Sequence, residues 1–247
     1  MLDPDELKNE PKKPTLVDIS HDEGGTQLIF AATRVIVVRE ELDKDEITDT
    51  PNQLDEYSEI FGVKHRYFQS MDTVWIPDKG SVIDVRIDAP RNFSSEAQVA
   101  AIGQVKDALK ILFGYDYLEH PVNLFPLIDL IYNDANEGNI VEAAFGTSTA
   151  SHKHEKMRRS HLDLRKELYH KAGKQALASG IALHLISVRW RRKLGGQIES
   201  LPELSLHVPV WETGAAQPSL LQGHVRNCMG YEDFDYVRGR MLHHLGL

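Results

Sequence analysis

The sequence has very little cysteine: Cys228 is the only one in 247 residues, so no disulfide framework can form within the chain. It also lacks any run of about 18 apolar residues, the length that a membrane-spanning helix needs. The opening residues, MLDPDELKNEPKKPT, carry mixed charge and no apolar segment of the kind that marks a secretory signal. These absences predict a cytoplasmic protein with no membrane contact.

Several catalytic and cofactor motifs are missing as well. The sequence holds no P-loop, no GxGxxG after a strand and no GxSxG elbow, so we expect no cofactor. Its composition, 41% hydrophobic and 26% charged, is that of an ordinary globular protein. A chain of this length can bury a sizeable core without metal or disulfide support.

Periodicity and turn chemistry predict the main elements. Residues 27–39 are rich in β-branched side chains and indicate a strand, and residues 65–76 and 81–87 form a hairpin about the turn Pro77-Asp78-Lys79-Gly80. Apolar residues at three- and four-residue steps predict a helix over 95–113, with a capping box of Ser95 and Gln98 and with Gly114 as its stop. Further strands are expected at 140–147, 181–190 and 204–211, and further helices at 162–177, capped by Ser160 and Asp163, and at 233–245.

These elements do not alternate regularly, which favours an α+β fold over a doubly wound one. We expect a mixed or mainly antiparallel sheet packed with two main helices, plus a C-terminal helix. Residues 1–14 are polar and rich in proline, and they are predicted to form a flexible arm. Residues 15–247 are predicted to form a single α+β domain with a basic segment at 151–193.

The charge distribution gives the leading functional hypothesis. The whole chain has a net charge of −9, yet residues 151–193 hold 12 Lys and Arg against 3 Asp and Glu. Such a segment is typical of a site for nucleic acid, another phosphate-rich ligand or an acidic protein partner, and Tyr169 and Trp190 offer stacking surfaces. The alternative is that the segment packs against the chain's own acidic surface. The cations expected to contact the polyanion are Lys153, Lys156, Arg158, Arg159, Arg165, Lys166, Arg191 and Arg192.

Histidine is frequent, with 12 residues in the chain. In an extended segment His152 and His154 point to the same side and could share a metal ion, with His161 or Asp163 as a third ligand. Neighbouring lysines and arginines repel a cation, so phosphate-facing or solvated histidines are the alternative. Cys228 follows His224 by four residues and is expected to be an ordinary small thiol rather than a nucleophile.

Two enzymatic alternatives remain. Thr147-Ser148-Thr149 and the later Gln197-Ile198-Glu199 resemble the Ser-Thr-Ser strand and the Gln/Glu-x-Glu turn of the ADP-ribosyltransferases, although Thr-Ser-Thr stands here in the first motif. The resemblance implies NAD consumption: Glu199 would stabilise the oxocarbenium character, Gln197 would orient the acceptor, Ser148 would support the glutamate, and Arg86 or Arg34 would hold the phosphates.

The second enzymatic alternative is a metal-dependent nuclease built on Asp78 and Asp84, with Arg86 at the place where such sites usually have lysine. A third class is a salt-sensitive self-assembly module, in which the acidic first 60 residues of one copy would pair with the basic segment of another. An oligomer is therefore among the expectations.

Overall fold

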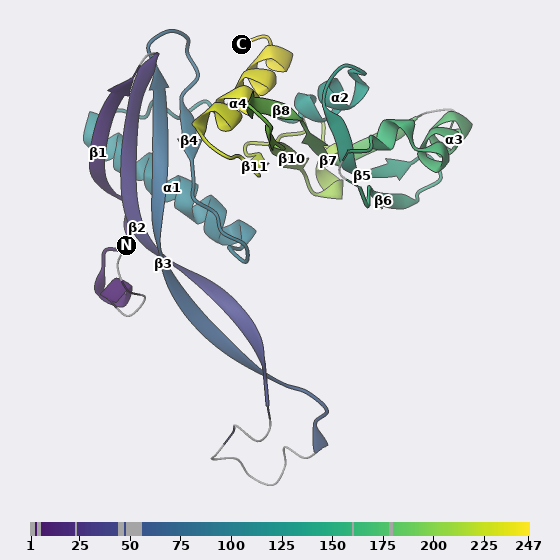
Figure 1. The fold of residues 1–247 in the computed structure, drawn as a ribbon. Coiled ribbons are helices and arrows are strands. Elements are labelled where there is room, and N and C mark those ends of the chain that lie inside the picture. The colour runs from purple at the N-terminus through teal and green to yellow at the C-terminus, as the bar shows by residue number, and fades with distance from the viewer. Residues whose placement is uncertain are drawn as a thin grey trace. The chain divides into compact units, whose positions relative to one another are not determined.

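The computed structural model describes residues 3, 6–22, 24–43, 47, 56–159, 161–177 and 180–247. Contacts within the chain divide it into two compact units, Met1–His120 and Pro121–Leu247, and each is described by itself below. No shift in composition marks this boundary, which is why the sequence predicts one domain over 15–247. Both units combine an antiparallel sheet with helices, so the predicted α+β class is confirmed (Figure 1).

The first unit is built on a four-stranded antiparallel meander in the order β1-β2-β3-β4. The strands are β1 (Thr15–Asp22), β2 (Gly25–Leu42), β3 (Ile60–Pro77) and β4 (Asp84–Arg86). β2 and β3 pair along all 18 residues of each strand, from Gly25 opposite Pro77 to Leu42 opposite Ile60. Their far ends extend as a two-stranded ribbon beyond β1 and β4 (Figure 1). The predicted hairpin is present as β3 and β4, but its second strand is shorter than the predicted 81–87, and residues 78–83 connect the two strands.

One helix, α1 (Ser95–Phe113), packs on this sheet and has the bounds that the sequence predicts. Its N-cap is Ser94 rather than the predicted Ser95, because the Ser94 hydroxyl accepts a hydrogen bond from the Ala97 amide. Gly114 ends the helix with a φ of 69°, as expected. The buried contacts between sheet and helix are made by Leu28, Phe30, Val74, Val105 and Leu109.

The N-terminal segment is partly ordered by packing. Residues Glu6–Asn9 form a short 3-10 helix, η1, in which Leu7 is buried. The Thr33 amide donates a hydrogen bond of 2.9 Å to the Pro11 carbonyl, which attaches the segment to β2. The prediction of a flexible arm over residues 1–14 rests on polar and proline-rich composition, and it does not account for the buried side chain of Leu7.

The second unit contains a five-stranded antiparallel sheet in the order β11-β10-β7-β5-β6 and a separate hairpin, β8–β9. The sheet strands are β5 (Asn139–Thr147), β6 (His152–Lys156), β7 (Ile181–Arg189), β10 (Glu203–His207) and β11 (His224–Arg226). The hairpin strands are β8 (Arg192–Gly195) and β9 (Ile198–Ser200). The strand predicted over 204–211 ends at His207, and a 3-10 helix, η5 (Val210–Gly214), follows.

Three α-helices belong to this unit: α2 (Pro126–Asn133), α3 (Leu168–Ala176) and α4 (Tyr231–Leu245). The helix predicted over 162–177 is shorter, because a 3-10 turn, η4 (Leu164–Lys166), precedes it and Glu167 caps α3. Ser160, its predicted cap, lies outside the described residues, while Asp163 caps η4. The predicted C-terminal helix is present. The core is formed by the apolar faces of α2 and α4 against β5, β7 and β10.

Among the described residues, none of the helices combines the length and the apolar character that crossing a membrane would require.

Candidate functional site

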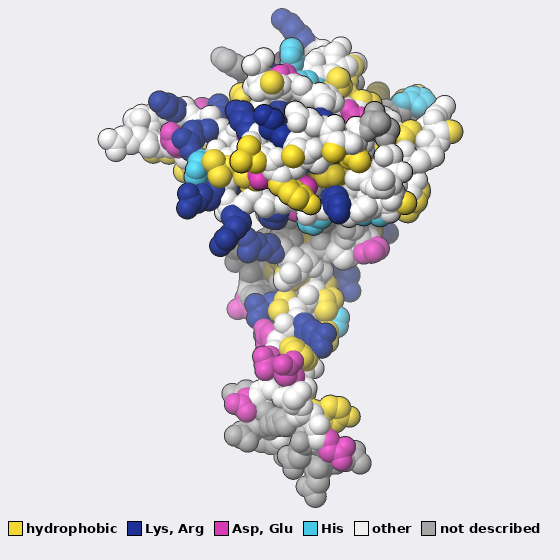
Figure 2. All heavy atoms as spheres, turned by 90° about the vertical axis from the view of Figure 1, so that its right-hand side faces the viewer, with side chains coloured by type: hydrophobic (Ala, Val, Ile, Leu, Met, Phe, Trp, Pro, Cys, Tyr) yellow, Lys and Arg dark blue, Asp and Glu magenta, His cyan; other side chains and the backbone are white. Residues whose placement is uncertain are grey.

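A group of exposed cations of the second unit lies along β6, the turn after it, η4 and α3. Residues 151–177 contain eight Lys and Arg against three Asp and Glu. Six of the eight are exposed: Lys153, Lys156, Arg158, Arg159, Lys166 and Lys171. In the upper part of Figure 2, Lys and Arg side chains gather along one side of the surface, next to hydrophobic side chains. Leu168 and Tyr169 contribute exposed apolar area, at 83% and 73% of their full surface.

The three acidic residues of this segment each have a partner within the protein. Glu155 Oε2 lies 2.5 Å from His170 Nδ1, and Asp163 accepts hydrogen bonds from the Arg165 guanidinium. Glu167 accepts from the His170 amide at 2.7 Å and thereby caps α3, and backbone hydrogen bonds of this kind lower its pKa. One outside carboxylate, Glu142, lies 3.1 Å from Lys156 Nζ and partly offsets that charge.

Two of the eight cations predicted to bind a polyanion have internal roles instead. The Arg165 guanidinium donates to the Asp163 carboxylate and to the carbonyls of Asp134, Glu137 and Gly138. A single side chain therefore fixes the loop between α2 and β5.

The second is Arg192, which lies 2.5 Å from Asp233 Oδ1 at the start of α4, and its guanidinium lies over the Tyr236 ring. Trp190, expected to offer a stacking surface, is buried in the apolar core, and its indole N–H donates to Glu137. Local sequence does not distinguish an arginine that fixes a loop from one that faces solvent.

A buried histidine links three elements beneath the exposed cations. His170 on α3 lies between Glu155 of β6 and Tyr132 of α2, with its Nε2 at 2.6 Å from the Tyr132 hydroxyl. Lys174 Nζ lies 3.4 Å from the same hydroxyl and 4.4 Å from the ring centre. Burial raises the pKa of Tyr132 to about 12, so the hydroxyl stays protonated at neutral pH. The carboxylate–imidazole–phenol chain could move a proton, and it also holds α3 against the sheet.

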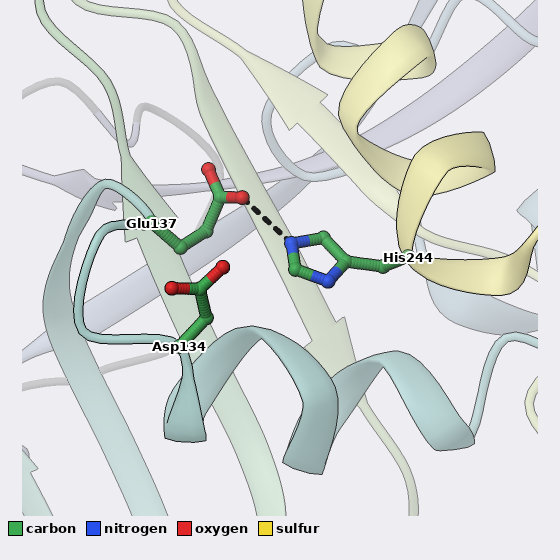
Figure 3. Close-up of side chains that lie close together, drawn as sticks. All are labelled: Asp134, Glu137 and His244. Carbon is green, nitrogen blue, oxygen red and sulfur yellow. Dashed lines mark hydrogen bonds and ion pairs between the residues drawn. The ribbon is translucent and has the colours of Figure 1, made fainter.

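A second cluster surrounds Glu137, in the loop between α2 and β5. Its carboxylate accepts hydrogen bonds from Trp190, Arg240 and His244, the last at 2.6 Å (Figure 3). Burial opposes the charged form of Glu137, but these donors outweigh it and lower its pKa to about 2. The cluster therefore joins α4 to the loop before β5 through one ionised carboxylate.

The same cluster has the residue types of a metal site. Possible ligand atoms of Asp134, Glu137 and His244 all lie within 4.8 Å of one another. Both oxygens of Glu137, however, already accept hydrogen bonds from protein donors, and the guanidinium of Arg240 supplies the positive charge that a metal would bring. A cation would have to displace Arg240, so the geometry favours an ion-pair centre that stabilises the fold.

The candidate metal ligands His152 and His154 have separate neighbours. The His152 ring lies 6.1 Å from the ring of His184 on β7, and His184 lies 6.5 Å from His207. His154 Nε2 lies 2.8 Å from Glu142 Oε1. Burial and the nearby histidines lower the pKa of His184 and favour its neutral form. Within the described ranges, the group with metal-ligand spacing contains neither His152 nor His154.

The residues of the ADP-ribosyltransferase resemblance are spread over both units. Arg86 lies on β4 of the first unit, 3.0 Å from Asp84, and Arg34 is buried with Ser70 and Asp72. Ser148 lies in the exposed turn between β5 and β6.

Gln197 occupies the turn of the β8–β9 hairpin, and Glu199 follows it on β9, 3.7 Å from Arg191 Nε. Within the second unit, Glu199 therefore lies beside Arg191. The transferase roles of Glu199, Gln197, Ser148 and either Arg86 or Arg34 stay a prediction.

The nuclease residues and the thiol have local partners too. The Asp84 carboxylate accepts a hydrogen bond from Arg86, and Asp78 lies 3.9 Å from the His21 ring. Cys228 is half-buried, and burial raises the pKa of its thiol, which disfavours a reactive thiolate.

A small crevice brings two separate stretches of the basic segment together. It has a volume of about 20 Å³, and its lining combines polar, cationic and apolar side chains: Asn139, His161, Arg189, Trp190, Arg191 and Leu201. The Asn139 side chain donates a hydrogen bond of 3.2 Å to the His161 carbonyl. His161 and Arg191, thirty residues apart in the sequence, therefore border the same depression.

The chain matches no family model, no curated protein and no solved structure.

Proposed function

We propose that the second unit binds a polyanion, with nucleic acid as its ligand class, without catalysing a reaction. The proposed basic surface consists of six cations that project from β6, the following turn, η4 and α3: Lys153, Lys156, Arg158, Arg159, Lys166 and Lys171. The observation that carries the proposal is their exposure, while the acidic residues of the same segment are bonded to the protein itself. Positive charge is therefore presented outward.

Phosphate groups are the ligands that such a surface suits best. Lysine and arginine that neutralise phosphates release condensed counterions, and this release supplies most of the affinity for nucleic acid. Tyr169, 73% exposed between Lys166 and Lys171 in the sequence, adds a ring on which a base can stack. The acidic remainder of the chain limits contact with phosphate elsewhere on the protein.

The crevice beside Arg191 supports an extension of this surface. Arg191 Nε lies 3.7 Å from the Glu199 carboxylate, and both side chains are about half exposed. Such an exposed ion pair contributes little to the stability of the fold. Arg191 and His161 are thus both able to turn toward a phosphate at the mouth of the crevice. Arg165 and Arg192 have no part in the proposal, because their guanidinium groups are held by internal acceptors.

The test is fluorescence anisotropy with a labelled 20-nucleotide oligo(dT), titrated at several salt concentrations. We expect log Kd to rise linearly with log salt concentration, with a slope of about 0.7 for each phosphate contact. The double substitution Arg158→Glu and Arg159→Glu should weaken binding at least tenfold and lower the slope.

The matched control is Lys12→Glu with Lys13→Glu, an exposed pair of cations in the first unit that gives the same change of net charge. If both double variants weaken binding equally, the affinity reflects net charge alone and the proposed surface is wrong. Binding of an acidic protein instead of oligo(dT) would identify the other partner class.

A further inference from the structure

The first unit contains an apolar cavity of about 230 Å³ between the sheet and the C-terminal half of α1. Its apolar walls are formed by Val74, Ile76, Ile83, Leu109 and Leu118. An apolar cavity of about 150 Å³ is already large enough to hold benzene. The space therefore suits one aromatic ring or a short alkyl chain, and hydrophobic burial supplies the driving force.

The polar residues of the lining carry a net positive charge. Lys106, Lys110 and Asp116 line the cavity together with the apolar side chains. Lys110 Nζ lies 3.8 Å from Asp116 Oδ2, so these two charges offset each other. Lys106 is half-buried and, among the residues that the structure describes, has neither a hydrogen bond nor an ion pair. A half-buried lysine in the lining of a cavity favours a ligand that carries one negative charge.

Aromatic side chains border the same space. Phe113 and Tyr117 both line the cavity and meet edge to face, with ring centres 5.8 Å apart. Both remain substantially exposed, at 45% and 61%. Exposed rings beside an apolar cavity can cover the part of a ligand that extends out of it.

We propose that this cavity binds a small amphiphilic carboxylate. The short apolar tail of the ligand would lie among side chains of β3, of α1 and of the loop before β4, and its carboxylate would lie against Lys106. The size of the cavity restricts the tail, and the uncompensated charge of Lys106 selects an anion. This binding site is independent of the basic surface of the second unit and of its ligand.

The experiment compares three probes of equal chain length: octanoate, 1-octanol and octylammonium. Binding is followed by NMR of the ¹³C-labelled methyl groups of Ile76, Ile83, Leu109 and Leu118, which line the cavity. We expect octanoate to shift these signals with about fivefold higher affinity than octanol, the difference expected from one partly screened ion pair. Octylammonium should bind more weakly than octanol.

Lys106→Met keeps most of the length of the side chain and removes its charge, so octanoate affinity should fall to the level of octanol. The control is Lys64→Met, on β3 about 33 Å along the strand from Val74 at the usual rise per residue. Ile83→Trp should fill the cavity and abolish binding of both probes.

Equal affinity of octanoate and octanol for the unaltered protein would overturn the assignment of Lys106. Methyl signals that do not respond to any probe would overturn the binding site itself. Because both results come from the unaltered protein, they hold even if Ile83→Trp fails to fold.

Discussion

His170 Nε2 lies 2.6 Å from the Tyr132 hydroxyl, and this contact joins α3 to α2 beneath the exposed lysines. The other ring nitrogen of His170 meets Glu155 of β6 at 2.5 Å. The imidazole is therefore bonded on both sides, which is how a buried histidine avoids the cost of an unsatisfied polar atom. The position of α3, and with it the position of Lys171, depends on this link.

The first prediction concerns the hydroxyl of Tyr132. Tyr132→Phe leaves His170 Nε2 without its partner and should lower the free energy of unfolding by about 1–3 kcal/mol. Urea unfolding followed by circular dichroism measures the change. Tyr169→Phe is the matched control, since Tyr169 is 73% exposed and should leave the stability within about 0.5 kcal/mol of the unaltered protein.

The same hydroxyl gives a dependence on alkaline pH. Burial raises the pKa of Tyr132 from 10.0 to about 12, so the folded state holds the proton more tightly than the unfolded state. Its stabilising contribution is therefore complete below pH 10 and is lost as the pH rises toward 12. Tyr132→Phe should be less sensitive to pH across this range. An equal dependence in both proteins would contradict the assignment.

The second prediction concerns Glu137. Its pKa is lowered from 4.5 to about 2, so the stability that its charged form gives is present above pH 4.5 and is lost as the pH falls through 2. The shift corresponds to about 3 kcal/mol. Glu137→Gln should cost about 3 kcal/mol at neutral pH, because Arg240 loses its charged partner, and should remove most of this acid dependence.

Glu199→Gln is the control for Glu137. Its carboxylate is 44% exposed and lies 3.7 Å from Arg191, so neutralising it should change the stability by no more than about 0.5 kcal/mol. Urea unfolding at pH 5 and pH 3 separates the two variants. A Glu137→Gln protein that loses as much stability on acidification as the unaltered protein would show that other carboxylates govern the acid transition.

Substitution by alanine at two glycines of the second unit should change the stability of the protein in opposite directions. A Cβ atom at Gly138 would lie 2.6 Å from the Arg189 carbonyl oxygen, a backbone atom that cannot move aside without disturbing β7. Gly173 on α3 has no atom within 4 Å of that position. Gly138→Ala should therefore destabilise the protein, whereas Gly173→Ala should stabilise it by up to about 1 kcal/mol through helix propensity. Thermal unfolding of both variants measures the difference, and equal shifts would contradict it.

The parts of the fold that sequence predicts well are those governed by local chemistry. The chain reversal after Pro77 and the stripe of α1 depend on residues within a few positions of one another, and both are present, although the connection between β3 and β4 runs over residues 78–83. Helix α2 is absent from the helices that the sequence predicts, because a proline such as Pro126 usually breaks a helical pattern. In the structure this proline lies in the first turn of the helix, where its missing N–H costs nothing. Strand β6 was missed because HKHEK has no apolar alternation, and it pairs on one side alone.

The candidate site shows the same limit. The exposure of Arg158 and Arg159 follows from a polar turn, but the internal hydrogen bonding of Arg165 depends on carbonyls of residues 134–138, about 30 positions away. The links from Glu137 to Trp190 and Arg240 span 53 and 103 residues. No local pattern carries such information, so charge clusters in a sequence identify the segment but not which of its cations face solvent.

The last prediction distinguishes the form of nucleic acid that the second unit binds. If a base stacks on Tyr169, Tyr169→Ala should weaken oligo(dT) binding by about 1–3 kcal/mol, because an unpaired base has a free face. A duplex of the same length keeps its bases stacked internally, and its affinity should depend on the basic surface alone. Tyr169→Phe, which retains the ring, should bind both probes normally. Equal losses for single strand and duplex in Tyr169→Ala would mean that the ring contributes to the shape of α3 rather than to stacking, and the ligand would then be recognised by its phosphates only.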